Sequence, residues 1–453
     1  MSEYPKANTT DGPAAPVSAL QSLLSRAPTP ALVAYASLVA FLTYFCMYAF
    51  RKPFAAGTFE GLTLLGTHVE LKTALVISQI IGYTVSKYIG IKVCSEVTPQ
   101  RRALLLVVLI VWAEAALVMF ALVPGAWKCV AIFLNGLPLG MVWGLVVWYL
   151  EGRRASEVML AVLSCSFIVS SGFVKDFGRW MMNDWSVSET WMPAVVGVIF
   201  LPLFLLSVWL LDQVPPPTTA DELARTARRP MGSSDRWEFV RRFFWGLLPL
   251  AIGCFFLIAY RDFRDNYQVE IFNGLGFPYE TNKLIITRAE TIVAFSVMAA
   301  MGLLFLIRDN RLGLFGALAI MTSGLILMGA STLLLDIGVI DGFWWMTLVG
   351  LGAYLAYVPF GSVLFDRLMA STRTTGTAVF AIYVTDAVGY TGSVGMQLYK
   401  DLGHHDVSRL EFFLAFTWFM SVLGSVLLIA SCAYFMGWVK YVPHAQPAPS
   451  QSL

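Results

Sequence analysis

Twelve apolar stretches run through this chain and constrain its fold more than any other feature of the sequence. Each has close to the ~20 apolar residues that a helix needs to cross a bilayer. The chain is 57% hydrophobic and 13% charged, whereas soluble domains carry roughly 25% charged residues. We therefore expect an all-α integral membrane protein with twelve transmembrane helices, at 31–50, 70–91, 103–123, 127–150, 157–177, 190–212, 243–261, 283–307, 311–335, 343–365, 374–398 and 411–438.

A polar segment at 213–242 divides these stretches into six and six. Its prolines and mixed charges are typical of a linker. We expect two pseudo-symmetric six-helix bundles, at 31–212 and 243–438, between disordered tails at 1–30 and 439–453. Basic loops on the side of the linker place that side, and both termini, in the cytoplasm. The expected location is the inner or plasma membrane of the cell, and the expected state is a monomer.

Composition also excludes several classes of function. The net charge is only +2, and no basic patch with interleaved aromatic residues points to nucleic acid. The six cysteines are scattered, so neither a metal site nor a disulfide framework is indicated. No glycine-rich phosphate loop and no nucleophile–base pair occurs. We expect no cofactor, no metal and no enzymatic activity.

Two arginines stand at matching places in the two halves. Tyr48-Ala-Phe-Arg51 closes the first stretch, and Ile258-Ala-Tyr-Arg261 closes the seventh. A charge at membrane depth is costly and normally faces the bundle interior. Guanidinium groups bind carboxylate or phosphate in a bidentate manner. Arg51 and Arg261, with Tyr48 and Tyr260 beside them, therefore predict a clamp for a small anion; the alternative is that both arginines reach the lipid headgroups.

Three more cations are candidates for the same site. Lys52 follows Arg51, and Arg264 follows Arg261 by three residues. Lys87 lies between Gly82 and Gly90 in the second stretch, where small residues indicate close helix packing and an inward-facing charge. We expect these cations to support the two arginines.

Acids within the apolar stretches are candidates for proton coupling or charge compensation. Asp386 lies near the middle of the eleventh stretch, and Glu290 lies in the eighth. Asp386 could pair with an arginine, carry a proton or remain a neutral acid. Glu114, in the third stretch, is a further acid with either a functional or a structural role.

Acids and bases in the cytoplasmic loops are candidates for gating. They could pair between helix ends and hold this side closed, or they could form ordinary solvated loops. These residues are Glu96, Arg101 and Arg102 after the second stretch, and Asp309 and Arg311 after the eighth.

Several motifs resemble the major facilitator superfamily and, within it, the organophosphate:phosphate antiporters. The resemblance implies that Arg51 and Arg261 hold the phosphate of an organic substrate, that Lys87 adds positive potential, and that inorganic phosphate is exchanged as two bundles rock around the site. It spans both halves and is carried by Tyr48-Ala-Phe-Arg-Lys-Pro-Phe54, by Gly82 to Arg101, by Ile258-Ala-Tyr-Arg261, and by Gly376-Thr-Ala with Gly389-Tyr-Thr-Gly392.

The chain also departs from that antiporter pattern. Phe167 stands where the antiporters have a histidine, and the segment from Asp262 to Asp265 is more acidic. These differences leave three alternatives open. The protein could transport another small organic anion by alternating access, with phosphate or protons as the coupling ion. It could be a proton-coupled symporter of a carboxylate or a neutral polar solute, or a receptor or scaffold that does not transport.

Overall fold

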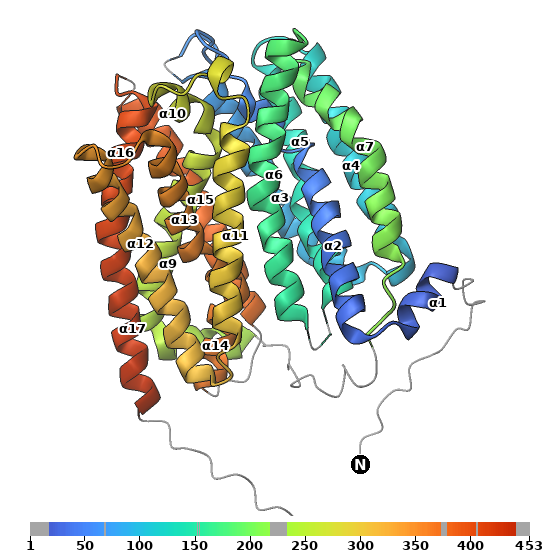
Figure 1. Cartoon of the computed structure of the whole chain (residues 1–453), viewed down its shortest axis with the longest axis vertical. Helices are drawn as coiled ribbons and strands as arrows, with labels where there is room; N and C mark the ends of the chain where they lie inside the picture. Colours follow the sequence, from blue (N-terminus) through green and yellow to red (C-terminus); the bar gives the residue numbers. More distant parts are fainter. Residues whose placement is uncertain are drawn as a thin grey trace, which may run out of the picture.

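The structure is a computed structural model that describes residues 18–67, 69–151, 153, 155–217, 233–372, 378–404 and 406–440. Two groups of long helices lie side by side, one from each half of the chain (Figure 1). The predicted all-α membrane architecture is confirmed. The N-terminal half consists of α2 (Thr29–Tyr48), α3 (Leu71–Glu96), α4 (Pro99–Leu122), α5 (Trp127–Leu150), α6 (Ser156–Asp184) and α7 (Met192–Asp212).

The C-terminal half repeats this plan. Its last span is made of three consecutive pieces, because a π-helical segment interrupts it. The long helices of this half are α9 (Ser233–Asn266), α11 (Ile285–Phe305), α12 (Asn310–Asp336), α13 (Gly342–Ser362), α15 (Ala378–Leu398), and the continuous run of α16 (Arg409–Phe419), η4 (Met420–Gly424) and α17 (Ser425–Lys440).

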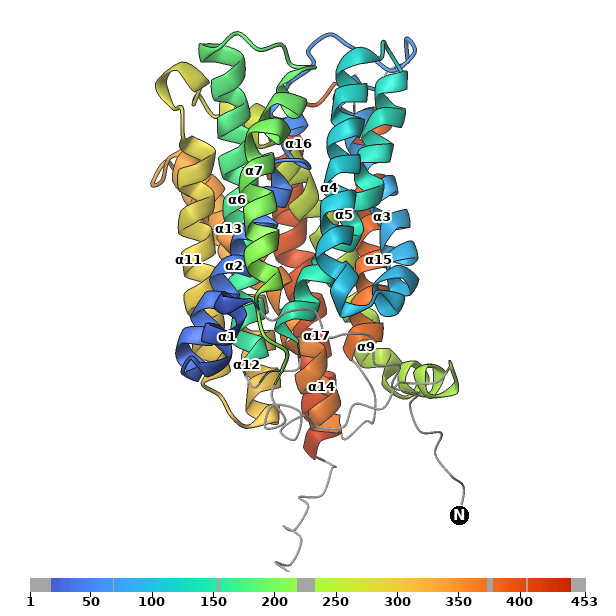
Figure 2. The same ribbon diagram turned by 90° about the vertical axis from the view of Figure 1, so that its right-hand side faces the viewer.

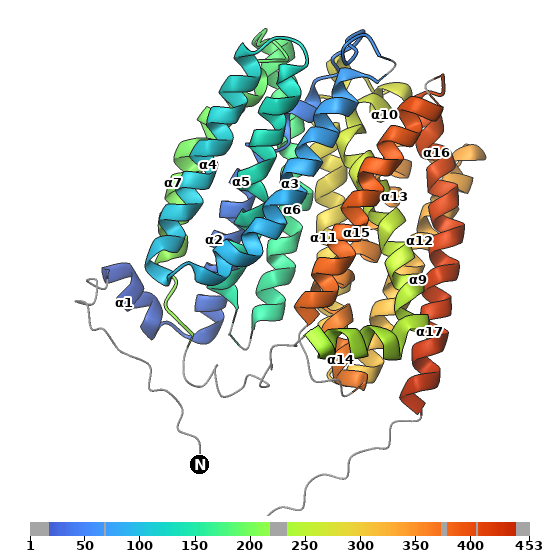
Figure 3. The same ribbon diagram turned by 180° about the vertical axis from the view of Figure 1, so that it is seen from behind.

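Helices α3 and α15 lie at the junction of the halves. Within the described residues, ten helices are long and apolar enough to cross a membrane. The sequence of α3 includes the polar residues Lys72, Gln79 and Lys87. These two helices pack against each other across the junction, as Figure 3 shows, and α6 packs against α11 in the same way. Lys72 and Lys87 reach residues of the other half, whereas Gln79 bonds within its own half.

Short helices complete the fold and correct two predicted boundaries. The tail predicted to be disordered through residue 30 is instead helical at α1 (Ala19–Arg26), where the Ser18 side chain caps the helix and Leu24 is buried. The linker is shorter than predicted, because α9 begins at Ser233 and bends at Phe243. Figure 2 shows the first part of α9 lying across the long axis. The remaining short helices are η1 (Pro53–Ala56), α10 (Gln268–Gly274), η2 (Tyr279–Thr281), α14 (Leu364–Thr372) and η3 (Tyr399–Gly403).

Glycines bring α3 and α5 into close contact. A Cβ atom at Gly82 would lie 2.3 Å from the Phe133 carbonyl oxygen, and one at Gly140 would lie 2.6 Å from the Tyr83 carbonyl oxygen. Only glycine permits this approach, as is common where membrane helices pack. The close packing predicted around Gly82 is confirmed, and it positions Tyr83 and Lys87 on α3.

Candidate functional site

The Arg51 side chain lies just after α2 and is buried without an acidic partner. The residue is 8% exposed, and its guanidinium carbon lies 4.0 Å from the centre of the Tyr83 ring. Arg51 Nη1 donates to Tyr48 Oη at 3.5 Å, and Nε has no hydrogen-bond partner. Among the described residues, no carboxylate forms an ion pair with this arginine. The guanidinium thus keeps donor capacity that an anion could use.

Two buried amides support the turn that carries Arg51. Gln79 Nε2 donates to the Arg51 carbonyl oxygen and to Asn135 Oδ1, each at 2.9 Å. Asn135 Nδ2 in turn donates to the Phe50 and Ala113 carbonyl oxygens at 2.9 and 3.1 Å. Helices α3, α4 and α5 are thereby connected to the end of α2. Such a buried hydrogen-bond network orders the backbone, so the position of Arg51 is set by its neighbours.

Arg261 occupies the matching place in the second half, with one difference. Its guanidinium carbon lies 4.0 Å from the centre of the Tyr357 ring on α13, which repeats the arrangement of Arg51 over Tyr83. However, Arg261 Nη2 also donates to Asp262 Oδ1 at 2.8 Å. The two arginines therefore have the same aromatic contact but differ in their acidic partners. Arg261 is partly neutralised by Asp262 of its own helix, and Arg51 has no such partner among the described residues.

Lys87 and Tyr390 connect the two halves beside these arginines. The Lys87 ammonium lies 5.4 Å from the Tyr83 ring centre and 5.0 Å from the Tyr390 ring centre. The Tyr83 and Tyr390 rings are 5.5 Å apart and meet edge to face. Arg51 and Lys87 thus share the Tyr83 ring, and Lys87 also contacts Tyr390 of the other half.

Aromatic rings from both halves extend this environment. The Tyr44 and Trp143 ring centres are 4.9 Å apart, and Trp143 is 6.1 Å from Phe167. Phe167 lies 6.1 Å from Tyr354 and 6.4 Å from Tyr357 in the other half. We call this set the arginine–aromatic cluster; it comprises Arg51, Lys87, Arg261, Tyr44, Tyr48, Tyr83, Trp143, Phe167, Tyr354, Tyr357 and Tyr390.

A second polar region joins the halves through ion pairs around Asp265. Lys52 and Lys175, both from the N-terminal half, pair with this carboxylate, Lys175 Nζ at 2.7 Å. Lys52 Nζ also donates to Asn266 Oδ1 at 2.9 Å, and Ser171 donates to Asp265. Burial lowers the pKa of the Lys52 ammonium to about 8, although Asp265 acts in the opposite direction. Asp265 is thus neutralised by two lysines.

More contacts across the halves surround Asp265 at the same end of the molecule. It is the end opposite α1 and the last turn of α17 (Figure 1). We call these contacts the cross-half latch. Besides the pairs at Asp265, it comprises Lys72 with Glu270, Arg409 Nη2 with Glu70 Oε2 at 2.6 Å, and Asp176 Oδ2, which accepts from Thr287 N and Oγ1 at 2.7 Å.

Several predicted binding residues lie outside the arginine–aromatic cluster. Arg264 is fully buried and donates to Glu290 Oε1 at 2.7 Å and to the Met346 carbonyl oxygen at 2.9 Å, so it connects α9, α11 and α13. Tyr260 faces α16, where its hydroxyl lies 2.9 Å from Thr417 Oγ1. Tyr260 therefore does not join Tyr48 beside the arginines, because it directly precedes Arg261 whereas Tyr48 lies three residues before Arg51. Lys52 belongs to the latch.

The predicted gating residues lie at the other end of the molecule. Arg102 lies over the Trp148 ring at 4.6 Å, within its own half, and Arg101 is exposed. The Asp309 side chain caps α12 by accepting from Arg311 N and Leu312 N. Their gating role stays a prediction. The side chains of Glu96 and Asp386 lie outside the described ones, although both residues are in helices.

The partners that define both regions were not predicted from the sequence. Tyr83 and Tyr390 belong to the motifs of the family resemblance and Tyr357 to none of them, and no periodicity shows that these tyrosines meet cations. Lys175 carried a usable signal, because it is a charge within a predicted span. Its partner, Asp265, lies in the other half of the chain, where only tertiary structure brings it close.

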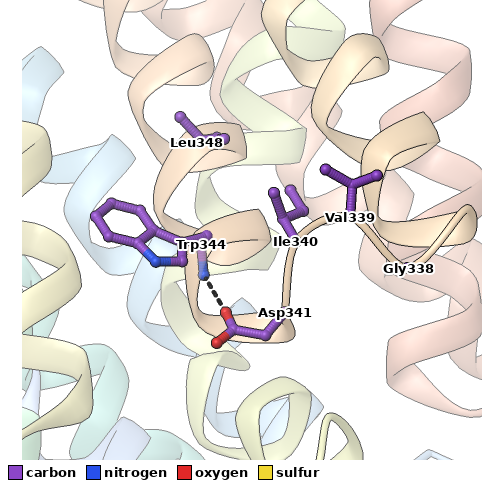
Figure 4. A pocket seen from close by; sticks show the side chains of 6 residues that line it. All are labelled: Gly338, Val339, Ile340, Asp341, Trp344 and Leu348. Carbon is purple, nitrogen blue, oxygen red and sulfur yellow. Dashed lines mark hydrogen bonds between the residues drawn. The ribbon is translucent and has the colours of Figure 1, made fainter.

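Within the described residues, no group of three or more histidine, cysteine, aspartate or glutamate side chains could hold a metal ion. A hollow on the surface lies between α12 and α13, where Asp341 Oδ1 accepts from Trp344 N at 2.9 Å (Figure 4). This hollow contains none of the predicted site residues, and its aspartate acts as a helix cap.

The fold is that of the major facilitator superfamily. The crystal structure of the nucleoside transporter NupG has a TM-score of 0.57 at 14% identity, with 89% of this chain and 99% of that chain covered. The crystal structure of a D-xylose-proton symporter has a TM-score of 0.57 at 14% identity, with 87% and 96% covered. The chain belongs to the family described as "Family of unknown function (DUF5690)", which matches residues 53–437. No curated protein matches the sequence. These comparisons give no support to the narrower resemblance to the organophosphate:phosphate antiporters.

Proposed function

We propose that this protein is a secondary transporter that moves a small organic anion across the membrane by alternating access. The observation that carries the proposal is the buried Arg51 guanidinium, which has aromatic neighbours and no acidic partner among the described residues. A buried cation normally requires a partner, because desolvation of an isolated charge is costly. A transported anion would supply that partner during each transport cycle.

The matching place of Arg261 supports the same conclusion. Each half contributes one guanidinium stacked on one tyrosine at 4.0 Å. In transporters built from two repeats, substrate sites lie at the interface of the repeats. A solute held by both halves would tie its binding to their relative movement. Because Arg261 is already paired with Asp262, Arg51 is expected to make the stronger contact with the anion.

The aromatic rings favour an organic anion with a planar body. Phe167 packs against Tyr354 and Tyr357 of the other half. A phenyl ring offers no hydrogen bond to a phosphate, whereas it can stack on an aromatic or planar solute. A carboxylate or phosphate on such a body would reach Arg51.

The cross-half latch supports alternating access. Ion pairs such as Lys52–Asp265 and Lys72–Glu270 join the halves at one end. If the basic loops face the cytoplasm, this end is the outer one. The conformation described here is then closed to the outside, and the latch must open once in each cycle.

A thermal-shift panel on the purified protein tests the proposal. The ligands are benzoate, phenyl phosphate, inorganic phosphate, acetate and neutral benzyl alcohol. A ligand present at about 100 times its dissociation constant stabilises by about 2.7 kcal/mol. We expect an anion with a ring to stabilise the wild type, and Arg51→Ala to weaken its binding roughly 10- to 100-fold, as loss of a charged hydrogen bond predicts. Arg101→Ala removes an exposed arginine and is the matched control.

Each arm of the panel has a defined meaning. Stabilisation by both phosphates but not by benzoate would make an organic phosphate the substrate class. Stabilisation by benzyl alcohol alone, or equal responses of wild type and Arg51→Ala, would contradict the anion site. Uptake of the stabilising anion into proteoliposomes, absent from Arg51→Ala, would separate a transporter from a receptor.

A further inference from the structure

Glu114 is a buried acid that none of the interactions above uses. It lies in α4, and the residue is 8% exposed. Neither Oε1 nor Oε2 has a hydrogen-bond partner. Glu290 provides an internal comparison, because it is also buried within a helix but accepts from Arg264 Nη1 at 2.7 Å. Of these two buried glutamates, Glu290 thus has a cationic partner, and Glu114 has none among the described residues.

The space around the Glu114 carboxyl is shaped by a glycine of α7. A Cβ atom at Gly197 would lie 1.9 Å from Glu114 Oε2 and 3.2 Å from the Phe50 ring. The carboxyl group and the Phe50 ring thus meet at the Gly197 Cα atom. Any larger residue at this position would displace one of them, so the fold provides a specific place for this carboxyl group.

No charged group of the neighbouring helices faces Glu114. Helices α5 and α7 pack against α4, and each contains one charged residue. Lys128 of α5 donates to a carbonyl oxygen of α4 at 2.7 Å, one turn or more beyond the carboxyl, and Asp212 of α7 accepts from Tyr149 at 3.0 Å at the far end of the helix. An ionised carboxylate at Glu114 would therefore be desolvated and uncompensated, whereas the neutral acid avoids most of this cost.

We propose that Glu114 is a proton-binding site, occupied in this conformation and coupled to the turn that carries Arg51. The coupling runs through short contacts. Asn135 donates both to the Ala113 carbonyl oxygen, directly before Glu114, and to the Phe50 carbonyl oxygen, directly before Arg51. Loss of the proton would require Glu114 to reach water or a cation. Either movement disturbs the packing of Phe50 and, with it, Arg51.

Infrared difference spectroscopy of the purified protein in lipid nanodiscs tests the proton site directly. The wild type is expected to show the carbonyl stretch of a protonated carboxylic acid that disappears at alkaline pH. The nearly isosteric variant Glu114→Gln keeps the shape without a titratable group and is expected to lose this band. Identical spectra of the two proteins would overturn the proposal. No substrate is needed, so this result is independent of the proposed function.

Chemical labelling compares Glu114 with Glu290 within the same protein. The apolar reagent dicyclohexylcarbodiimide adds to protonated carboxyl groups and remains attached as an N-acylurea, so mass spectrometry of peptides locates it. We expect label on the Glu114 peptide at acidic pH, loss of that label at alkaline pH, and none on the Glu290 peptide, since that acid is paired with Arg264. Label on Glu290 rather than Glu114 would contradict the assignment.

The coupling between Glu114 and the Arg51 turn rests on the proposed function and is tested by a separate measurement. Binding of benzoate or phenyl phosphate is followed by thermal shift against pH, in wild type and in Glu114→Gln. We expect the wild type to lose affinity as the Glu114 band disappears and the variant to change less over the same range. If affinity depended on pH in the same way in both proteins, and the wild type still showed the Glu114 band, the proton site would stand. The coupling between Glu114 and anion binding would then be overturned.

Discussion

The cross-half latch and the arginine–aromatic cluster both bury cations, and they neutralise them in different ways. In the latch, Lys52 and Lys175 share the carboxylate of Asp265. In the cluster, the Arg51 guanidinium lies over the Tyr83 ring and forms no ion pair with an acid among the described residues. A buried ion pair holds two surfaces together once its desolvation has been offset. A buried cation with aromatic neighbours keeps its attraction for an anion that arrives later. This difference indicates that the latch connects the two halves, whereas the arginine–aromatic cluster can bind an anion.

Removal of the shared acid should give the largest effect. Asp265→Asn leaves Lys52 and Lys175 buried without a carboxylate, and breaking a buried pair typically costs about 3–5 kcal/mol. We expect a marked fall in the thermal unfolding temperature of the purified protein. Asp309→Asn is the matched control, because this exposed aspartate caps a helix and asparagine caps about as well. Equal unfolding temperatures for wild type and Asp265→Asn would show that the latch carries no net stability.

Removal of the Tyr83 ring should have a smaller effect, and it should change only the binding of the anion. Tyr83→Leu takes the ring from beneath Arg51, and a cation–π contact contributes about 0.5–2 kcal/mol. We expect the affinity for the stabilising anion to fall roughly 2- to 30-fold as Arg51 loses its orientation. Tyr88→Leu, at an exposed tyrosine on the same helix, is the control and should bind as the wild type does. An equal loss of affinity in Tyr88→Leu would show that the effect comes from a change in the helix and not from the lost contact with Arg51.

The latch should also respond to pH through Lys52. In the closed form its pKa is about 8, below the ordinary value of about 10.4. Opening would hydrate the ammonium and restore that ordinary value, so the open form binds more protons between these limits. A rise in pH from about 8 toward 10.4 therefore favours the closed form.

Spin labels can measure this opening. Leu65 and Leu402 are exposed residues from the two halves near the latch end, and the distance between labels placed there reports on closure. We expect the population with the short distance to grow as the pH rises above about 8 in the wild type, consistent with the pKa of Lys52. Lys52→Gln should lack this dependence. Growth of the long-distance population in the wild type would reverse the sign and contradict the argument.

The smallest effect is expected for the unpaired arginine, and it completes the comparison. Arg51→Met removes a buried charge that has no acidic partner, so the lost aromatic contact is offset by relief of desolvation. We expect the free energy of unfolding to change by no more than about 1 kcal/mol, while binding of the anion is lost. Chemical denaturation in mixed detergent micelles provides the measurement. Destabilisation as large as that of Asp265→Asn would mean that Arg51 has a structural partner.

Much of the fold could be predicted because its causes are local. An apolar stretch of about 20 residues must be helical in lipid, where each backbone polar group needs a partner. The boundary errors also have local causes. The Ser18 cap extends order into the expected tail, and the bend at Phe243 lets α9 begin earlier than the apolar pattern suggests.

The candidate site was less predictable, because its partners come from distant parts of the chain. Arg51 was identified from its own charge, but Tyr83 became relevant only because the fold brings its ring to Arg51, and Tyr390 only because α15 packs against α3. Tyr260 directly precedes Arg261, whereas Tyr48 lies three residues before Arg51, so the two tyrosines lie on different faces of their helices and Tyr260 contacts α16.

The sequence by itself determined that the chain spans a membrane with two similar halves and that few charges are buried within it. The cost of a charge in lipid makes each of those charges significant wherever it occurs. Only the tertiary structure decided which charges are paired. Asp265 meets lysines of the other half, Arg264 meets Glu290, and Arg51 and Glu114 are left without an opposite charge among the described residues. Pairing depends on distances of a few ångströms between helices that are far apart in the chain, and no sequence pattern encodes these distances directly.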